Sequence, residues 1–229
     1  MYNMEFKTTL KNFTLFARLG GNTKTGKGIM ISILPKNGLD LETVRSKGAS
    51  SCGDCPHAKA VAGRKHGSCY TYKRPGGSQG VLGGINNGFH RCDEISLVSF
   101  TNKVQVLAEL SGYIRVGEFG DPAADKQVAE TLADILKGVD ASVTRAGYTH
   151  QWKKAKAKAL KGLVMASCDT LEENKKARKA SWGTFYVEPR KEDNLENTHC
   201  PSQKTKGVVT CAKCGLCDGG DRAISINLH

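Results

Sequence analysis

Residues 113–138 read YIRVGEFGDPAADKQVAETLADILKG, and this stretch decides the fold class. Its first four residues, Tyr113–Val116, form a short apolar run bounded by glycine, which is typical of a buried strand. Pro122 suits the first position of a helix, and Asp121 precedes it as a candidate cap. Apolar residues then recur on one helical face until Gly138. The stretch therefore predicts a strand, a loop and an amphipathic helix.

The same alternation continues along the chain. Helix-like stretches run from Trp152 to Gly162 and from Leu171 to Ala180. The other apolar runs of strand length are Ile29–Leu34, Ser96–Phe100, Ser142–Arg145, Leu163–Ser167 and Thr184–Val187. This alternation favours a parallel sheet with right-handed crossovers. The strands from residue 96 onward are too few for a complete eight-stranded barrel, so we expect an α/β fold built as a partial barrel or an open parallel sheet.

Length and composition predict one compact domain. The chain has 229 residues, of which 39% are hydrophobic and 24% charged, so it can bury a core. We divide it into residues 1–92, 93–190 and 191–229: a polar lead-in with a first cysteine-rich segment, an α/β core and a second cysteine-rich segment. The longest apolar run, Gly28–Leu34, is too short to cross a bilayer, and the N-terminus lacks the apolar core of a secretory signal. We therefore expect a cytoplasmic protein with no membrane partner.

Nine cysteines, an odd number in a chain without a visible export signal, fit a disulfide framework poorly and favour metal binding. Seven of them fall into two groups. The N-terminal group is Cys52, Cys55 and Cys69, and the C-terminal group is Cys200, Cys211, Cys214 and Cys217. The C-terminal group supplies the four thiolates that a 4Fe-4S cluster needs, and the alternative is a four-thiolate zinc site.

The N-terminal group offers only three clear thiolates, which leaves three interpretations open. It could hold a cluster with an open fourth iron, a cluster completed by Cys92, His57 or His66, or a zinc ion completed by a histidine. We expect the isolated Cys92 and Cys168 to be small buried apolar residues, because that is the commoner role of a lone cysteine.

Polar residues follow the predicted strands, and the carboxyl ends of parallel strands meet at one edge of a sheet. Glu118, Tyr148 and His150 are therefore candidate catalytic residues. Asp121 and Asp169 lie at the same edge, where capping of a helix is the simpler interpretation. Arg115, inside a strand, needs either a carboxylate partner such as Glu118 or an anionic ligand.

The net charge of +12 favours polyanionic partners. The candidate residues for contact with nucleic-acid phosphates crowd one predicted helix and are Lys153, Lys154, Lys156 and Lys158. The alternative is that these lysines form a solvated helix face. No known sequence-reading module is visible.

A set of short motifs spans residues 22–217. They are Asn22-x-Lys24-Thr25-Gly26, Cys52-x2-Cys55-Pro56, Cys69-Tyr70, Arg115 followed by Gly120-Asp121, Tyr148-Thr149-His150, Cys200-Pro201 and Cys211-x2-Cys214-Gly215-x-Cys217. Together they resemble a family of small cysteine-rich gene products from bacteriophages and plasmids, whose strand-end segments are similar to partial barrels of the radical S-adenosylmethionine type. The resemblance implies an iron–sulfur protein acting in an infected cell, with Arg115, Gly120 and Asp121 as cofactor-binding residues.

Three hypotheses follow from these features. The leading one is a phage-type protein that binds one or two 4Fe-4S clusters and serves electron transfer or gives structural support to non-specific nucleic-acid binding. The second is a radical-SAM-like enzyme, in which an open iron of the N-terminal cluster binds S-adenosylmethionine. The third is a zinc-stapled module that binds a host or phage protein.

Overall fold

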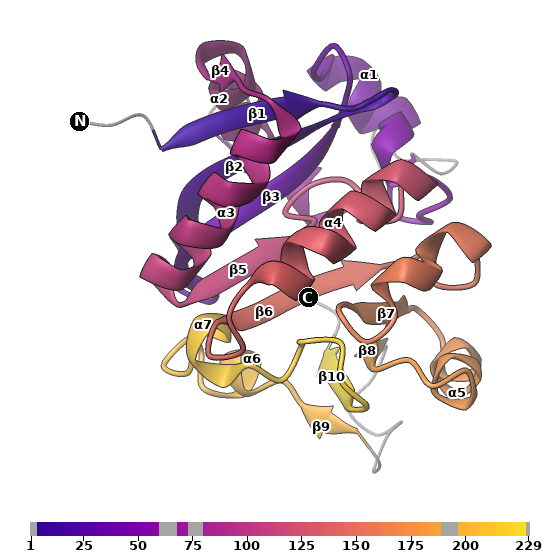
Figure 1. The fold of residues 1–229 in the computed structure, drawn as a ribbon. Helices are drawn as coiled ribbons and strands as arrows, with labels where there is room; N and C mark the ends of the chain where they lie inside the picture. Colours follow the sequence, from indigo (N-terminus) through magenta and orange to yellow (C-terminus); the bar gives the residue numbers. More distant parts are fainter. Residues whose placement is uncertain (1–3, 60–67, 73–79, 189–196, 228–229) are drawn as a thin grey trace.

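The computed structural model describes residues 4–59, 68–72, 80–188 and 197–227, and in these residues ten strands form one sheet (Figure 1). The strand order is β4-β1-β2-β3-β5-β6-β7-β8-β10-β9. The strands are β1 (Glu5–Thr9), β2 (Phe13–Asn22), β3 (Gly26–Pro35), β4 (Asp93–Glu94), β5 (Tyr113–Val116), β6 (Thr144–Thr149), β7 (Met165–Cys168), β8 (Thr184–Glu188), β9 (Thr198–His199) and β10 (Ala223–Asn227). Strand β2 pairs antiparallel with β1 and β3, whereas the other neighbouring pairs run parallel. The predicted α/β class is therefore confirmed, with a sheet that is mostly parallel.

Helices connect and cover the strands. The α-helices are α1 (Leu41–Lys47), α2 (Val81–Arg91), α3 (Leu97–Ser111), α4 (Lys126–Gly138), α5 (Leu171–Lys179), α6 (Pro201–Lys204) and α7 (Cys211–Cys214), and the short 3-10 helices are η1 (Ser50–Cys52), η2 (Tyr70–Tyr72) and η4 (Ala155–Leu160). None of the helices described has the length and apolar character that crossing a membrane requires.

The predicted strand–helix unit is present, with a shifted helix start. β5 covers Tyr113–Val116, as predicted, and α4 ends at Gly138. The helix begins at Lys126 rather than at Pro122, because Asp125 caps it by accepting a hydrogen bond from the Val128 backbone N–H at 2.8 Å. The predicted cap Asp121 lies upstream of this helix.

One strand prediction before β5 is wrong and another is confirmed. The run Ser96–Phe100 is the start of α3 and not a strand, because buried residues continue at helical spacing through Phe100, Val104 and Ala108. The strand expected at Ile29–Leu34 lies within β3, and the strands β1 and β2, which the sequence did not predict, pair beside it. Consecutive residues of β2, including Leu15 and Phe16, are buried, so both faces of this strand are covered.

The pleat of β3 separates two layers of the core. Ile29, Ile31 and Ile33 point to the face that α3 and α4 cover, and Figure 1 shows these two helices lying across the sheet. Met30 points to the opposite face, where it packs with Tyr113 and Ala146 of neighbouring strands against the C-terminal cysteine segment. One face of the central strands is therefore covered by helices and the other by cysteine-bearing loops.

Replacing Leu132 with alanine tests the packing of α4 on the sheet. Leu132 is fully buried, so we expect the variant to lower the free energy of unfolding by about 3 kcal/mol in a urea titration. The matched control is Leu110→Ala on α3, whose leucine is 79% exposed and should change that energy by no more than about 0.5 kcal/mol. Equal losses in both variants would contradict this packing.

Candidate functional site

Backbone hydrogen bonds hold the C-terminal group against the sheet. The Cys200 N–H donates to the Ser225 carbonyl of β10 at 2.8 Å, and the Cys211 N–H donates to the Lys24 carbonyl of the β2–β3 turn at 3.0 Å. Gly215, at φ 67°, ends α7 and redirects the chain. Figure 1 shows α6 and α7 beside the beginning of β6. The segment is thus attached to strands from both ends of the chain.

The four thiols of the C-terminal group lie within electrostatic reach of one another. Burial, with a smaller contribution from the neighbouring thiols Cys200, Cys211 and Cys214, raises the pKa of Cys217 to about 12, against a lowering hydrogen bond from Tyr148. Burial also raises the pKa of Cys211, and the positive charge of Arg115 opposes that rise. Thiolates so placed repel one another, and a bound cation or cluster would remove this repulsion.

Tyr148 and Arg115 extend from β6 and β5 over the C-terminal group. The Tyr148 hydroxyl is hydrogen-bonded to the Cys217 thiol, and burial raises the pKa of Tyr148 well above its usual value. Its ring lies 4.5 Å from the ring of Phe185, and the Arg115 guanidinium carbon lies 5.8 Å from the Tyr148 ring centroid. Both residues therefore belong to the surroundings of the sulfur atoms.

Turns bring the N-terminal group together at the carboxyl edge of the parallel strands. The Cys55 N–H donates to the Cys52 carbonyl at 3.2 Å, and the Cys69 N–H donates to the His57 carbonyl at 3.0 Å. Burial, with a smaller contribution from the nearby thiols of Cys69 and Cys55, raises the pKa of Cys52 to about 12. The segment is fixed to the sheet edge because the Asp121 N–H donates to the Ser51 carbonyl at 2.8 Å.

Two histidines and one carboxylate meet beside the N-terminal group. The Nε2 atom of His57 lies 2.9 Å from Oδ1 of Asp169, and Nε2 of His150 lies 3.5 Å from Oδ2. The nitrogen and carboxylate oxygen atoms of these residues lie within 4.8 Å of one another, as the ligands of one metal ion would. The Cys55 thiol is close enough to His150 to raise the pKa of the imidazole, so the His57–His150–Asp169 triad lies beside the thiols.

The triad perturbs the protonation of its members. Burial alone would lower the pKa of His150, but the hydrogen bonds to Asp169 and Cys55 raise it to about 10. Burial alone would raise the pKa of Asp169, but hydrogen bonds to His150 and His57 hold it below its usual value. The favoured state at neutral pH is therefore a carboxylate beside a protonated His150.

Neither Asp121 nor Asp169 caps a helix, because the caps of α4 and α5 are Asp125 and Thr170. Asp121 accepts hydrogen bonds from the Ala123 N–H at 2.8 Å, the Thr149 hydroxyl at 2.6 Å and the His150 N–H at 2.9 Å. These bonds fix the end of β6 from which the His150 side chain projects. The cap of α5 is Thr170, not Asp169. The sequence signal for Asp169 was its position immediately after β7.

The predicted catalytic residues lie at three positions instead of one. His150 belongs to the triad, Tyr148 to the C-terminal group, and Glu118 forms an ion pair with Arg18 of β2 at 2.5 Å. Arg18 was not identified from the sequence.

The predicted cofactor-binding residues are likewise divided, with Arg115 at the C-terminal group and Asp121 near the triad. Gly120 has a structural explanation. Its φ is +76°, and a Cβ atom there would lie 2.2 Å from the Ile33 carbonyl oxygen.

The isolated cysteines are buried, as expected. The Cys92 thiol donates to the Phe89 carbonyl at 3.7 Å, and the Cys168 thiol donates to the Ala166 carbonyl at 3.6 Å. His66, one of the considered fourth ligands, lies outside the described residues.

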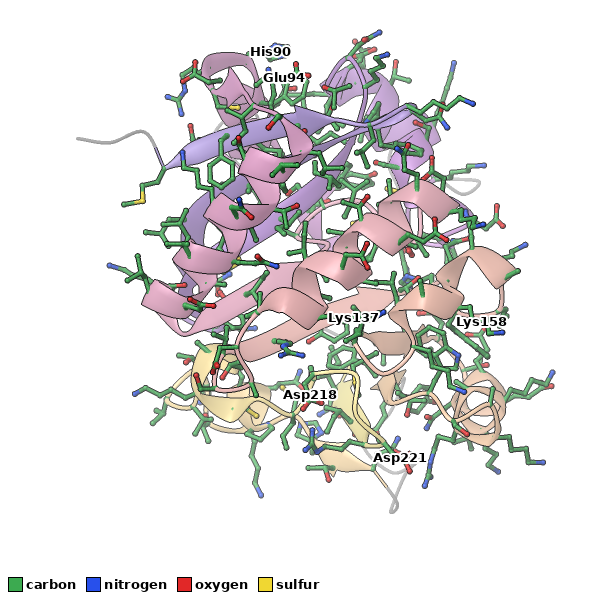
Figure 2. All side chains as sticks on the ribbon, viewed as in Figure 1. His90, Glu94, Lys137, Lys158, Asp218 and Asp221 are labelled. Carbon is green, nitrogen blue, oxygen red and sulfur yellow. The ribbon has the colours of Figure 1, made fainter. Side chains whose placement is uncertain are left out.

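The lysines predicted to contact nucleic acid are partly engaged in contacts within the protein. Lys153 forms an ion pair with Glu173, Lys154 lies 3.2 Å from Asp54, and the Lys156 ammonium donates to the Ala124 carbonyl at 2.6 Å. Lys158, labelled in Figure 2, is exposed. Nucleic-acid contact through these lysines stays a prediction.

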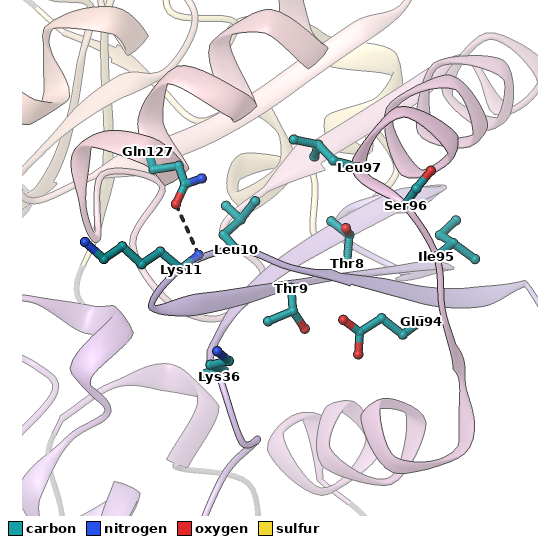
Figure 3. Close-up of a pocket in the computed structure, with 10 residues that line it drawn as sticks. All are labelled: Thr8, Thr9, Leu10, Lys11, Lys36, Glu94, Ile95, Ser96, Leu97 and Gln127. Carbon is teal, nitrogen blue, oxygen red and sulfur yellow. Dashed lines mark hydrogen bonds between the residues drawn. The ribbon is translucent and has the colours of Figure 1, made fainter.

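A pocket of about 730 Å³ lies apart from the cysteine groups (Figure 3). Polar side chains of β1 and the start of α3 line much of it, and the Lys11 N–H donates across it to the Gln127 side-chain oxygen at 3.2 Å. Its lining contains no cysteine or histidine, and Glu94 is its one carboxylate.

Comparison with known proteins found no family model, no curated protein and no solved structure that matches this chain. The cysteine groups and the triad are therefore the features that bear on function.

Replacing Asp169 with asparagine tests the ionic contribution of the triad in chelator-treated, reduced protein. At about pH 6 we expect the free energy of unfolding to fall by about 2 kcal/mol, because a partly buried imidazolium loses its carboxylate. Folding raises the pKa of His150 from 6.5 to about 10, so this contribution is full below pH 6.5 and is lost as the pH rises through about 10. Urea titrations should show the difference from wild type shrinking over that interval.

The matched control is Asp134→Asn, which makes the same substitution at an exposed position of α4. Its free energy of unfolding should stay within about 0.5 kcal/mol of wild type at both ends of the interval. A deficit in Asp169→Asn that is independent of pH would rule out the proposed ionic pairing.

Proposed function

We propose that this protein is an iron–sulfur protein of the phage type that its motifs resemble, with a 4Fe-4S cluster on the C-terminal group. The observation that supports this proposal is the gathering of Cys200, Cys211, Cys214 and Cys217 on one face of the sheet, within electrostatic reach of each other. Four thiolates are the full protein ligand set of such a cluster. Its role would be electron transfer or stabilisation of the fold.

Among the described residues, no three thiols lie as close together as the ligands of a single zinc ion would. Zinc–sulfur bonds of about 2.3 Å in a tetrahedron place thiolates about 3.8 Å apart. Among the described residues, the three-ligand set whose atoms all lie within 4.8 Å of one another is the triad and not a set of thiols. A four-iron cluster lies between its thiolates and holds them further apart than one ion does.

The surroundings of the C-terminal group suit a redox role. Hydrogen bonds to the sulfur atoms and nearby positive charge both tune the potential of a cluster. Tyr148 supplies such a hydrogen bond to Cys217, and Arg115 supplies positive charge beside Cys211. The four cysteines are partly exposed, so electrons could be exchanged with a partner protein at this surface.

Purification without oxygen should yield a brown protein with about four iron and four sulfide ions for the C-terminal site. The double variant Cys214→Ala, Cys217→Ala should lose these ions, since it removes half of the ligand set. Cys168→Ala is the control, because its buried thiol donates to a backbone carbonyl and should leave the iron content unchanged. Colourless wild-type protein with stoichiometric zinc would instead support the zinc-stapled interaction module, with a host or phage protein as its partner.

A radical-SAM-like activity is the second candidate, and the N-terminal group favours it. Its three thiols lie near each other at the carboxyl edge of the parallel strands, next to the polar side chains of His150 and Asp169. Three thiolates leave one iron of a 4Fe-4S cluster without a cysteine, and S-adenosylmethionine would bind there. The resemblance implies a partial barrel, and the sheet of the described residues runs in one linear order from β4 to β9.

Reductive cleavage of S-adenosylmethionine tests this candidate. With dithionite as the electron donor, wild-type protein should produce methionine and 5′-deoxyadenosine, measured by chromatography and mass spectrometry. Cys69→Ala should abolish both products, whereas Cys92→Ala should not, because Cys92 donates to the Phe89 carbonyl within α2. Absence of both products from iron-loaded wild-type protein would leave electron transfer or a structural role as the function.

A further inference from the structure

The triad joins three segments that are distant in the sequence. His57 follows the first two cysteines, His150 follows β6 and Asp169 follows β7. His57 and Asp169 are 112 positions apart, yet their side-chain atoms lie 2.9 Å from each other. The rings of the two histidines pack edge to face with centroids 5.7 Å apart. Two imidazoles are thus held on one carboxylate at the carboxyl edge of the sheet.

Further contacts hold the imidazoles in position. The Nδ1 atom of His57 lies 2.6 Å from the Ser68 hydroxyl, so Nε2 is the ring atom that faces Asp169. Histidines that bind metals are oriented in this way, by a hydrogen bond at the ring nitrogen that does not bind the ion. Asp121 fixes the backbone of His150 through the bond to its N–H at 2.9 Å.

We propose that His57, His150 and Asp169 bind one divalent first-row transition-metal ion of the iron(II) or manganese(II) class. Two histidines and one carboxylate form the facial ligand set of non-haem iron sites, which leaves further coordination positions for water or a substrate. The site uses none of the seven grouped cysteines, and it requires that His57 is not the fourth ligand of the N-terminal group.

Binding would replace the shared hydrogen bonds of the metal-free triad. The ion would take the place of the proton between Asp169 and the imidazoles, and the proton would pass to solvent. A divalent charge would also compensate the carboxylate, as the protonated imidazole does in the metal-free protein. The triad is therefore preassembled, and binding requires only small side-chain movements.

Manganese(II) is the probe for this site, because it prefers nitrogen and oxygen ligands to thiolates. Full-length protein is titrated with manganese(II), and free ion is measured by its electron paramagnetic resonance signal. We expect one ion bound per chain. Asp169→Asn and His57→Ala should weaken binding by at least about tenfold, and Ser68→Ala by about tenfold through loss of ring orientation.

Matched controls distinguish binding at this site from manganese(II) binding elsewhere on the protein. Asp134→Asn and His90→Ala change the same residue types at exposed positions and should bind as wild type does. The triple variant Cys52→Ser, Cys55→Ser, Cys69→Ser should retain the ion. Only variants whose circular dichroism spectrum matches that of the folded wild type are compared. If Asp169→Asn does not fold, His57→Ala and Ser68→Ala still test the site. Absence of stoichiometric binding by wild type, binding unaffected by the triad variants, or loss only in the cysteine variant would each overturn the proposal.

Discussion

The alternation of side chains along the central strands is the constraint on which the other features depend. In β3 the residues Ile29, Ile31 and Ile33 face the helices, and Met30 between them faces the cysteine-bearing loops. A shift of one residue in the pairing of β3 with β5 would exchange these faces. The hydrophobic layer under α3 and α4 therefore sets the register, and the register decides which side chains meet the sulfur atoms.

That register also determines the chemistry of the second face. Arg115 and Tyr148 reach the C-terminal group because each lies between two buried residues of its strand, whose positions face the opposite layer. The carboxyl ends of β6 and β7 place His150 and Asp169 at the same edge, and Asp121 ties that edge to the loop after β5. Two groups of thiols and one triad thus share a single scaffold, although the two thiol groups are more than a hundred residues apart in the sequence and His57 and Asp169 are 112 positions apart.

Local patterns predicted the local part of this structure. The run Tyr113–Val116 and the periodicity of α4 were sufficient for the parallel α/β class, because both signals lie within one short window. The strand predicted at Ser96–Phe100 was wrong, since a window of five residues does not separate the start of a helix from a buried strand. The cysteine groups were visible from spacing. The triad was not, because contacts across 112 positions depend on tertiary pairing that one sequence does not display.

The attachment of Cys200 and Cys211 to backbone carbonyls of β10 and of the β2–β3 turn has a consequence for biosynthesis. A ribosome translates the C-terminal group after β2, β3, β5 and β6 have emerged. Until then Met30 and Tyr113 of the nascent sheet have no cover on the sulfur-facing side, and this apolar surface is open to chaperones. The docking of this last-synthesised segment is therefore the step that covers the second face of the sheet.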